Sequence, residues 1–137
     1  MDDDDEALYR AGLREGWGCE LLVRTVRGQV LITTAMEHHY TDLPRADRNK
    51  VTRIMTGWCE GRPLTNEMFR NEGRSPKGVM LQAFKTWAHR LYGFHTAVDG
   101  IKSFVIVDCD PAKKRVDANQ TVLNRAKGRV DAFGRGK

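Results

Sequence analysis

The pair Asp99 and Gly100 limits how this chain can fold more than any other feature, because it separates two apolar stretches. A two-residue hairpin turn needs positive φ angles, which aspartate tolerates and glycine adopts freely. The flanking stretches, HRLYGFHTAV and IKSFVIVDC, are rich in aromatic and β-branched residues, as strands are. They predict antiparallel strands over residues 89–98 and 101–109. Gly93, in mid-strand, marks a bulge or a place where another backbone comes close.

Three other stretches have the composition of strands. CELLVRTV and QVLITTA, residues 19–26 and 29–35, predict two strands joined by a tight turn at Gly28. VMLQAFK, residues 79–85, predicts a strand that precedes the Asp-Gly hairpin. Before it, TNEMFRNEG could form one or two helical turns, and GRSPKG, residues 73–78, predicts a mobile loop because of its glycines and proline.

Two segments carry apolar residues at helical spacing. The first, residues 43–60, has an apolar stripe of Val51, Ile54, Met55, Trp58 and Cys59. Thr41 or Asp42 is expected to cap this helix, with Pro44 in its first turn. The second follows Pro111 and has a stripe of Ala118, Val122, Leu123, Ala126 and Val130. The sequence therefore predicts an α+β fold, with helices packed on a mainly antiparallel twisted sheet, an N-terminal hairpin and a C-terminal helix.

The length of 137 residues fits a single domain with one core. We expect residues 1–18 to be an acidic, flexible segment, residues 19–133 to form the domain, and residues 134–137 to be a flexible tail. The chain has no apolar run of the roughly 20 residues that a membrane helix needs. Its start, MDDDDE, lacks the features of a secretory signal, so we expect a cytoplasmic protein that does not contact membranes.

Cysteine and histidine spacing gives no indication of a metal site or another cofactor. The three cysteines lie far apart and form no CxxC pair, so neither a disulfide framework nor a zinc site is predicted. His38 and His39 are adjacent and are expected to point apart, which disfavours joint binding of a metal.

Charge is distributed unevenly along the chain. Five of its 18 acidic residues lie within residues 2–6, so 23 Lys and Arg residues face 13 acidic residues in the remainder, a net charge of +10. Such a basic body suits a phosphate-rich partner such as nucleic acid, although an acidic protein would also be complementary.

Cationic and proton-exchanging side chains are concentrated in FKTWAHRLYGFH, residues 84–95. Histidine exchanges protons near neutral pH, arginine and lysine stabilise a phosphate, and tryptophan stacks on a base, so metal-independent RNA cleavage by 2′-hydroxyl attack becomes possible. The candidate catalytic residues are Lys85, His89, Arg90, Tyr92 and His95. The candidate RNA-binding residues are Lys85, Trp87, Arg90, Lys113, Lys114 and Arg115.

These residues also have ordinary structural interpretations. Alternation along a strand places Arg90, Tyr92 and Phe94 on one face and both histidines on the other. Tyr92 and Phe94 could be core aromatics, and Arg90 could pair with Asp108 or Glu67. The histidines could be surface or hydrogen-bonded structural residues.

Several of these motifs resemble the C-terminal half of the RelE/HigB family of bacterial toxins, especially its phage-derived branch. The resemblance is carried by LQAFKTWAHRLYGF, by the hairpin after it, and by FVIVDCDPAKKR with a helix containing LNRAKGRV. In that branch a strand ends in arginine or lysine before an aromatic-glycine-aromatic segment, YGF here, and a later strand is followed by paired lysines. LPRADRNKVTRIMTGWCEG takes the place of the family's helical hairpin, and the resemblance covers roughly residues 29–130.

The resemblance implies a RelE-like fold and an mRNA interferase, the toxin of a type II toxin-antitoxin system. Such a toxin enters the A site of the small ribosomal subunit, cleaves the bound mRNA without a metal and is neutralised by an antitoxin protein. By position, Lys85 matches a basic residue of the family's central strands, Arg90 its phosphate-binding arginine, and Lys113 or Lys114 a late basic residue. The chain departs from the family in its extra N-terminal hairpin and in having no tyrosine after Tyr92.

Two other functions are compatible with the same sequence. One is a toxin of the ParE kind, which binds DNA gyrase instead of cleaving RNA. The other is a noncatalytic nucleic-acid or protein-binding module of the same fold, for which salt-sensitive RNA binding without cleavage would be evidence.

Overall fold

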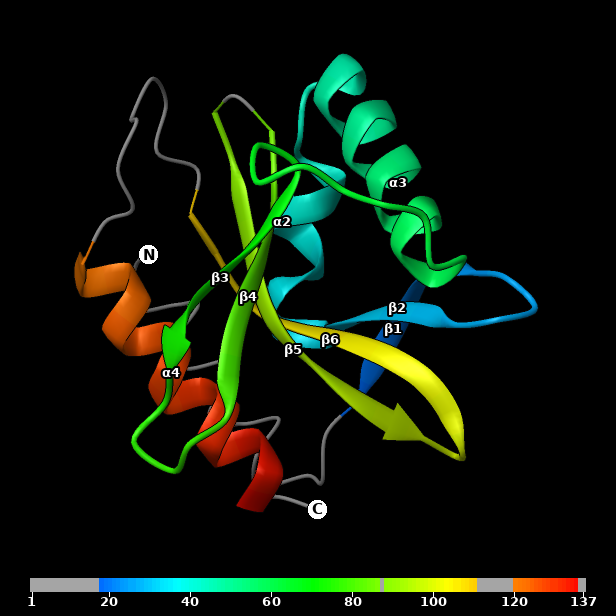
Figure 1. Cartoon of the computed structure of the whole chain (residues 1–137). Coiled ribbons are helices and arrows are strands. Elements are labelled where there is room, and N and C mark those ends of the chain that lie inside the picture. Colours follow the sequence, from blue (N-terminus) through cyan, green and yellow to red (C-terminus); the bar gives the residue numbers. More distant parts are fainter. Residues whose placement is uncertain (1–17, 87, 111–119, 136–137) are drawn as a thin grey trace.

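The computed structural model describes residues 18–86, 88–110 and 120–135, which form one six-stranded sheet with helices on both faces (Figure 1). The strands are β1 (Cys19–Arg24), β2 (Gln29–Thr33), β3 (Phe69–Arg74), β4 (Met80–Lys85), β5 (Arg90–Val98) and β6 (Ile101–Asp110). Their order across the sheet is β1-β2-β6-β5-β4-β3. Every neighbouring pair is antiparallel except β2 and β6, which are parallel. The α+β class with a mainly antiparallel sheet is thus confirmed.

The helical elements are a 3-10 turn η1 (Thr34–Met36), α2 (Glu37–Thr41), α3 (Arg45–Cys59) and α4 (Gln120–Arg135). The predicted long helix and C-terminal helix are therefore present, and α4 extends two residues into the predicted flexible tail. The prediction of a cap at Thr41 or Asp42 is wrong, because Thr41 ends α2 and Asp42 follows it. Pro44 precedes α3 without a side-chain cap. Among the described residues, no helix has the length and apolar character needed to cross a membrane.

Helices α3 and α4 cover opposite faces of the sheet (Figure 1). On one face, Trp58 of α3 packs edge-on against Phe84 and Phe104, with ring centroids 6.3 and 5.7 Å apart. On the other, Phe133 of α4 packs edge-on against Phe94 of β5 at 5.6 Å. The predicted alternation along β5 is confirmed, since Phe94 contacts α4 while His95 contacts α3 through Trp58 at 5.4 Å.

Strand β3, at the edge of the sheet, is absent from the predictions. Its sequence, FRNEGR, is polar and lacks the apolar alternation of a half-buried strand. The pairing with β4 shifts register between Asn71 and Gly73, and Gly73 has a φ of +100°. The prediction of a mobile loop over residues 73–78 is wrong at its start, because Gly73 and Arg74 belong to β3. The turn after them is tied to α4, since the Ser75 hydroxyl donates to the Asp131 carboxylate at 2.6 Å.

The central hairpin follows the predicted pattern. Asp99 and Gly100 both have positive φ, 53° and 77°, and join β5 directly to β6. The β5-β6 register shifts between Tyr92 and Gly93, which confirms the predicted irregularity. A Cβ atom at Gly93 would lie 2.1 Å from the carbonyl oxygen of Val105, so only glycine fits here.

Replacing Gly93 with alanine is expected to lower the free energy of unfolding by about 1–3 kcal/mol, because the added methyl group must push β5 and β6 apart. Urea denaturation measures the change. Gly128→Ala in α4 is the matched control, since no atom lies within 4 Å of its added Cβ, and alanine there should stabilise the helix by up to about 1 kcal/mol. A Gly93→Ala protein as stable as the wild type would contradict the close approach.

Candidate active site

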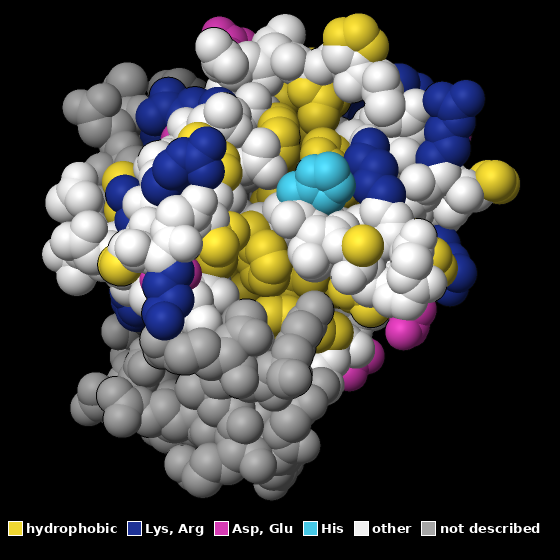
Figure 2. All heavy atoms as spheres, turned by 60° about the horizontal axis from the view of Figure 1, so that its bottom comes forward, with side chains coloured by type: hydrophobic (Ala, Val, Ile, Leu, Met, Phe, Trp, Pro, Cys, Tyr) yellow, Lys and Arg dark blue, Asp and Glu magenta, His cyan; other side chains and the backbone are white. Residues whose placement is uncertain are grey.

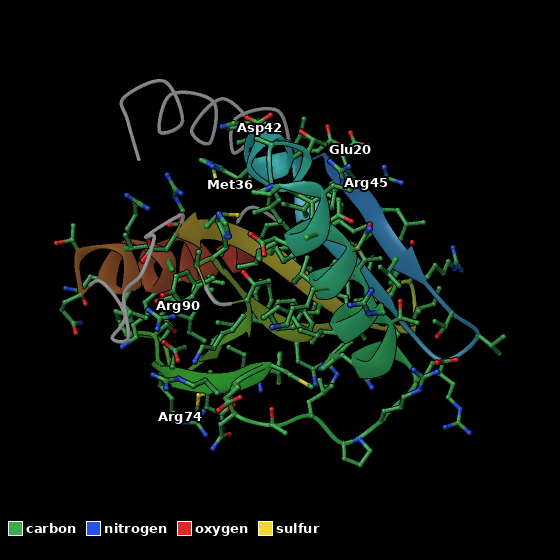
Figure 3. All side chains as sticks on the ribbon, turned by 90° about the horizontal axis from the view of Figure 1, so that it is seen from above. Glu20, Met36, Asp42, Arg45, Arg74 and Arg90 are labelled. Carbon is green, nitrogen blue, oxygen red and sulfur yellow. The ribbon has the colours of Figure 1, made fainter. Side chains whose placement is uncertain are left out.

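Three of the predicted site residues, Lys85, His89 and Arg90, meet at the end of the sheet where β4 ends and β5 begins. Lys85 is the last residue of β4 and pairs in register with Arg90, the first residue of β5. Arg90 in turn lies opposite Asp110, the last residue of β6. The connection is tight, because the Thr86 N–H donates to the His89 carbonyl oxygen at 2.9 Å. In Figure 3, Arg90 lies apart from Glu20 of β1 and from Arg45 of α3.

Four further predicted RNA-binding residues lie outside the described residues: Trp87, Lys113, Lys114 and Arg115. Trp87 belongs to the connection between β4 and β5, and the other three follow Asp110 in the sequence. Their predicted roles remain predictions.

A small, shallow pocket lies at this end of the sheet, with a cavity volume of about 20 Å³. Its walls come from α2, from the segment before α3, and from the ends of β5 and β6. The lining residues are His39, Leu43, His89, Arg90, Leu91, Cys109 and Asp110. Apolar side chains and a thiol therefore share the pocket with two imidazoles, a guanidinium and a carboxylate.

His89 is positioned in this pocket by α3. Its Nδ1 lies 3.4 Å from Oδ2 of Asp47 and 3.4 Å from Oγ1 of Thr86. The side chains of His89 and Asp47 are 11% and 30% exposed, so both are partly shielded from solvent. Because Nδ1 faces these two oxygens, Nε2 is the ring nitrogen left to act on a ligand. Asp47 and His39 were not among the predicted site residues.

His38 and His39 do not point apart as predicted. Their ring centroids are 4.1 Å apart with an interplanar angle of 36°. The prediction is wrong because the residues belong to α2, where successive side chains differ by about 100° instead of lying on opposite faces of a strand. Within the described ranges, no three His, Cys, Asp or Glu side chains are grouped closely enough to bind a metal ion.

Lys85 lies beside two arginines. Loss of hydration lowers the pKa of its ammonium group, and the charges of Arg70 and Arg90 lower it further. Arg70 also forms an ion pair with Glu72. A half-buried lysine between cations is a good partner for an anion, because a bound phosphate would relieve the repulsion among the three charges.

The other two candidate catalytic residues lie away from the pocket. Tyr92 is fully buried, as its interpretation as a core aromatic requires. His95 is exposed but lies five residues beyond Arg90 on β5, about 17 Å along an extended strand. Asp108, one of the partners considered for Arg90, binds two arginines of α4, Arg125 and Arg129.

Burial raises the pKa of the Tyr92 phenol well above its usual range, although the Arg90 guanidinium opposes the shift. The unfolded chain therefore ionises Tyr92 from about pH 10, while the folded chain keeps it neutral. The free energy of unfolding should fall more steeply above pH 10 in the wild type than in Tyr92→Phe, by about 1.4 kcal/mol per pH unit. Urea denaturation between pH 8 and about pH 11 checks this, and parallel pH profiles would contradict it.

Comparison of this chain with models of protein families, with curated protein sequences and with solved structures found no match.

Proposed function

We propose that this protein is a metal-independent endoribonuclease whose active site is the pocket where β5 begins and β6 ends. The observation that carries the proposal is the meeting of His39, His89 and Arg90 around one pocket, although they come from distant parts of the sequence. Two imidazoles can move the two protons that RNA cleavage requires, and a guanidinium can stabilise the phosphate between them.

In the proposed reaction, Nε2 of His89 removes the proton of an RNA 2′-hydroxyl. The 2′-oxygen then attacks the adjacent phosphorus, and the bond from phosphorus to the 5′-oxygen breaks. Protonated His39 gives its proton to that leaving oxygen. The products are a 2′,3′-cyclic phosphate and a free 5′-hydroxyl, with one proton gained by His89 and one given up by His39.

Neighbouring charges support these roles. The carboxylate of Asp47, 3.4 Å from Nδ1 of His89, can hold the imidazole ring in one orientation. Arg90 lines the pocket, and Lys85 and Arg70 are close enough for their charges to interact. Negative charge that develops on the phosphate oxygens would therefore form next to fixed cations.

The resemblance to the RelE/HigB family suggests what RNA the protein would cleave in the cell. As a toxin of the RelE/HigB kind, the protein would cleave mRNA in the A site of the ribosome and would be neutralised by an antitoxin protein. The net charge of +10 outside residues 1–6 supports a partner rich in phosphate. Figure 2 shows Lys and Arg side chains spread over the face at the bottom of Figure 1, so the basic surface is not confined to the end of the sheet that holds the pocket.

The direct test is to incubate the purified protein with RNA in the presence of a metal chelator, with and without ribosomes, and to analyse the new ends. Cyclic phosphate and 5′-hydroxyl ends are expected, and a substrate with a 2′-deoxynucleotide before the cleaved bond should stay intact. Cleavage of the deoxy substrate, or no cleavage in either condition, would overturn the proposal.

The noncatalytic alternative also has an observation in its favour. Arg90 is only 7% exposed and lies opposite the buried Asp110, an arrangement that suits a structural pair at the end of a sheet. Salt-sensitive RNA binding without cleavage would favour this module. Inhibition of gyrase supercoiling by the purified protein would instead favour the ParE-like function.

A further inference from the structure

The outer face of α3 is a second cationic surface, separate from the pocket. Five residues of α3 are exposed, and none of them is acidic: Arg45, Ala46, Asn49, Lys50 and Arg53. Asp47, the only carboxylate of the helix, is partly buried and faces His89. Within the part of the chain that the structure describes, no carboxylate lies within ion-pair distance of the three exposed cations.

The cations on this face are not placed where the helix dipole would stabilise them. Arg45 is its first residue, where positive charge opposes the helix dipole, and the last turn contains no basic residue. Lys50 and Arg53 are three residues apart, so like charges face each other along one side of the helix. Stability does not explain this arrangement, whereas an anionic partner would.

The composition of the face selects among anionic partners. Along the helix axis the cations span about 12 Å and stand on a convex surface. Single-stranded RNA is usually held by aromatic side chains on which bases stack, but the only aromatic residue of α3, Trp58, is buried in the core. Double-helical RNA is recognised by its shape and its phosphates, which needs no exposed aromatic group.

We infer that the outer face of α3, through Arg45, Lys50 and Arg53, binds the phosphate backbone of double-helical RNA. Figure 3 places Arg45 apart from Arg90, and none of Arg45, Lys50 and Arg53 lines the pocket. Glu20 and Asp42 appear near Arg45 in the same view, which makes Lys50 and Arg53 the better pair to mutate. A folded RNA held here would leave the pocket open to a single strand. The inference requires RNA binding but does not require the pocket to be catalytic.

The test measures binding to a short RNA duplex and to a single strand of equal length, over a range of salt concentrations. All proteins carry His89→Ala, so that cleavage does not interfere. The variant Lys50→Ala/Arg53→Ala removes two charges from the α3 face. Its matched control, Arg74→Ala/Lys77→Ala, removes two exposed charges, one from the last residue of β3 and one from the turn after it.

For duplex binding, the slope of the logarithm of the binding constant against the logarithm of the salt concentration should be less steep by about two in the α3 variant. Each phosphate that the variant no longer neutralises accounts for about one unit. Between 50 and 200 mM salt, the duplex affinity of the protein with an intact α3 face should therefore fall about 16-fold more than the duplex affinity of the α3 variant. The control variant and single-strand binding should change little. Equal reductions in both variants, a reduction limited to the single strand, or no binding of the duplex would each overturn the inference.

A cleavage assay separates this inference from the proposed function. In a background with His89 intact, Lys50→Ala/Arg53→Ala should cleave a short single strand at the wild-type rate. If neither the wild type nor any variant cleaves RNA, the proposal of an active site in the pocket fails. If the α3 variant nevertheless binds the duplex more weakly than the control variant, the inference that α3 binds double-helical RNA is retained.

Discussion

Replacing His89 with alanine is expected to reduce the rate of RNA cleavage about 10²- to 10⁴-fold, the usual contribution of a general base. His89 lines the pocket and has Nδ1 turned toward Asp47, so it is the best-positioned base in the described part of the chain. His89 is not part of the buried apolar cluster, and its side chain is 11% exposed, so the far-UV circular dichroism of the variant is compared with that of the wild type to establish that it folds. Cleavage of RNA under single-turnover conditions measures the chemical step directly.

His95→Ala is the matched control, because it removes an imidazole of β5 that lies outside the pocket, whereas His89 directly precedes this strand. His95 is exposed, lies further along β5 than the pocket, and contacts the ring of Trp58 from α3. Its removal should leave the cleavage rate within about twofold of the wild type. A large decrease in His95→Ala with little change in His89→Ala would place the active site elsewhere on β5 and contradict the pocket assignment.

The elements with strong apolar patterns were predictable from sequence. The Asp99-Gly100 turn fixes the central hairpin, and the apolar stripe of α3 matches the residues that it buries. Strand β3 was missed because an edge strand can be polar on both faces and still pair through its backbone. Helix α2 was missed because five residues are too few for a helical period to appear in the sequence.

The candidate site was predictable only where it is local. Lys85, His89 and Arg90 are close in sequence, so a strand, a tight turn and a second strand bring them together. His39 and Asp47 reach the same region through the packing of α2 and α3 on the sheet, which depends on contacts distant in sequence. No pattern in the sequence marks either of them as a partner of His89.

Strand alternation also could not show which face of β5 is covered. It predicts Arg90, Tyr92 and Phe94 on one side; α4 packs on that side at Phe94, and all three residues are buried. Arg90 still lines the pocket because it is the first residue of β5, where the strand begins. Tyr92, two residues further along β5, is fully buried in the core.

The attachment of α4 to this face depends on Asp108, and Asp108→Ala is expected to lower the free energy of unfolding by about 3–5 kcal/mol. Its carboxylate is fully buried and binds Arg125 at 2.8 and 3.0 Å and Arg129 at 3.0 Å. Alanine would leave two guanidinium groups between helix and sheet without this counter-charge, and removing one member of a buried ion network costs more than the network contributes.

Urea denaturation of Asp108→Ala beside Asp42→Ala tests this dependence, since Asp42 is an exposed aspartate at the end of α2. The control should change the free energy of unfolding by no more than about 0.5 kcal/mol. A decrease below about 1 kcal/mol in Asp108→Ala would mean that α4 is held mainly by its apolar contacts, such as Phe133 on Phe94. A large decrease would mean that the ion pairs of Asp108 with Arg125 and Arg129 attach α4 to the sheet. Asp108 pairs in register with Tyr92, two residues along β5 from Arg90 at the pocket.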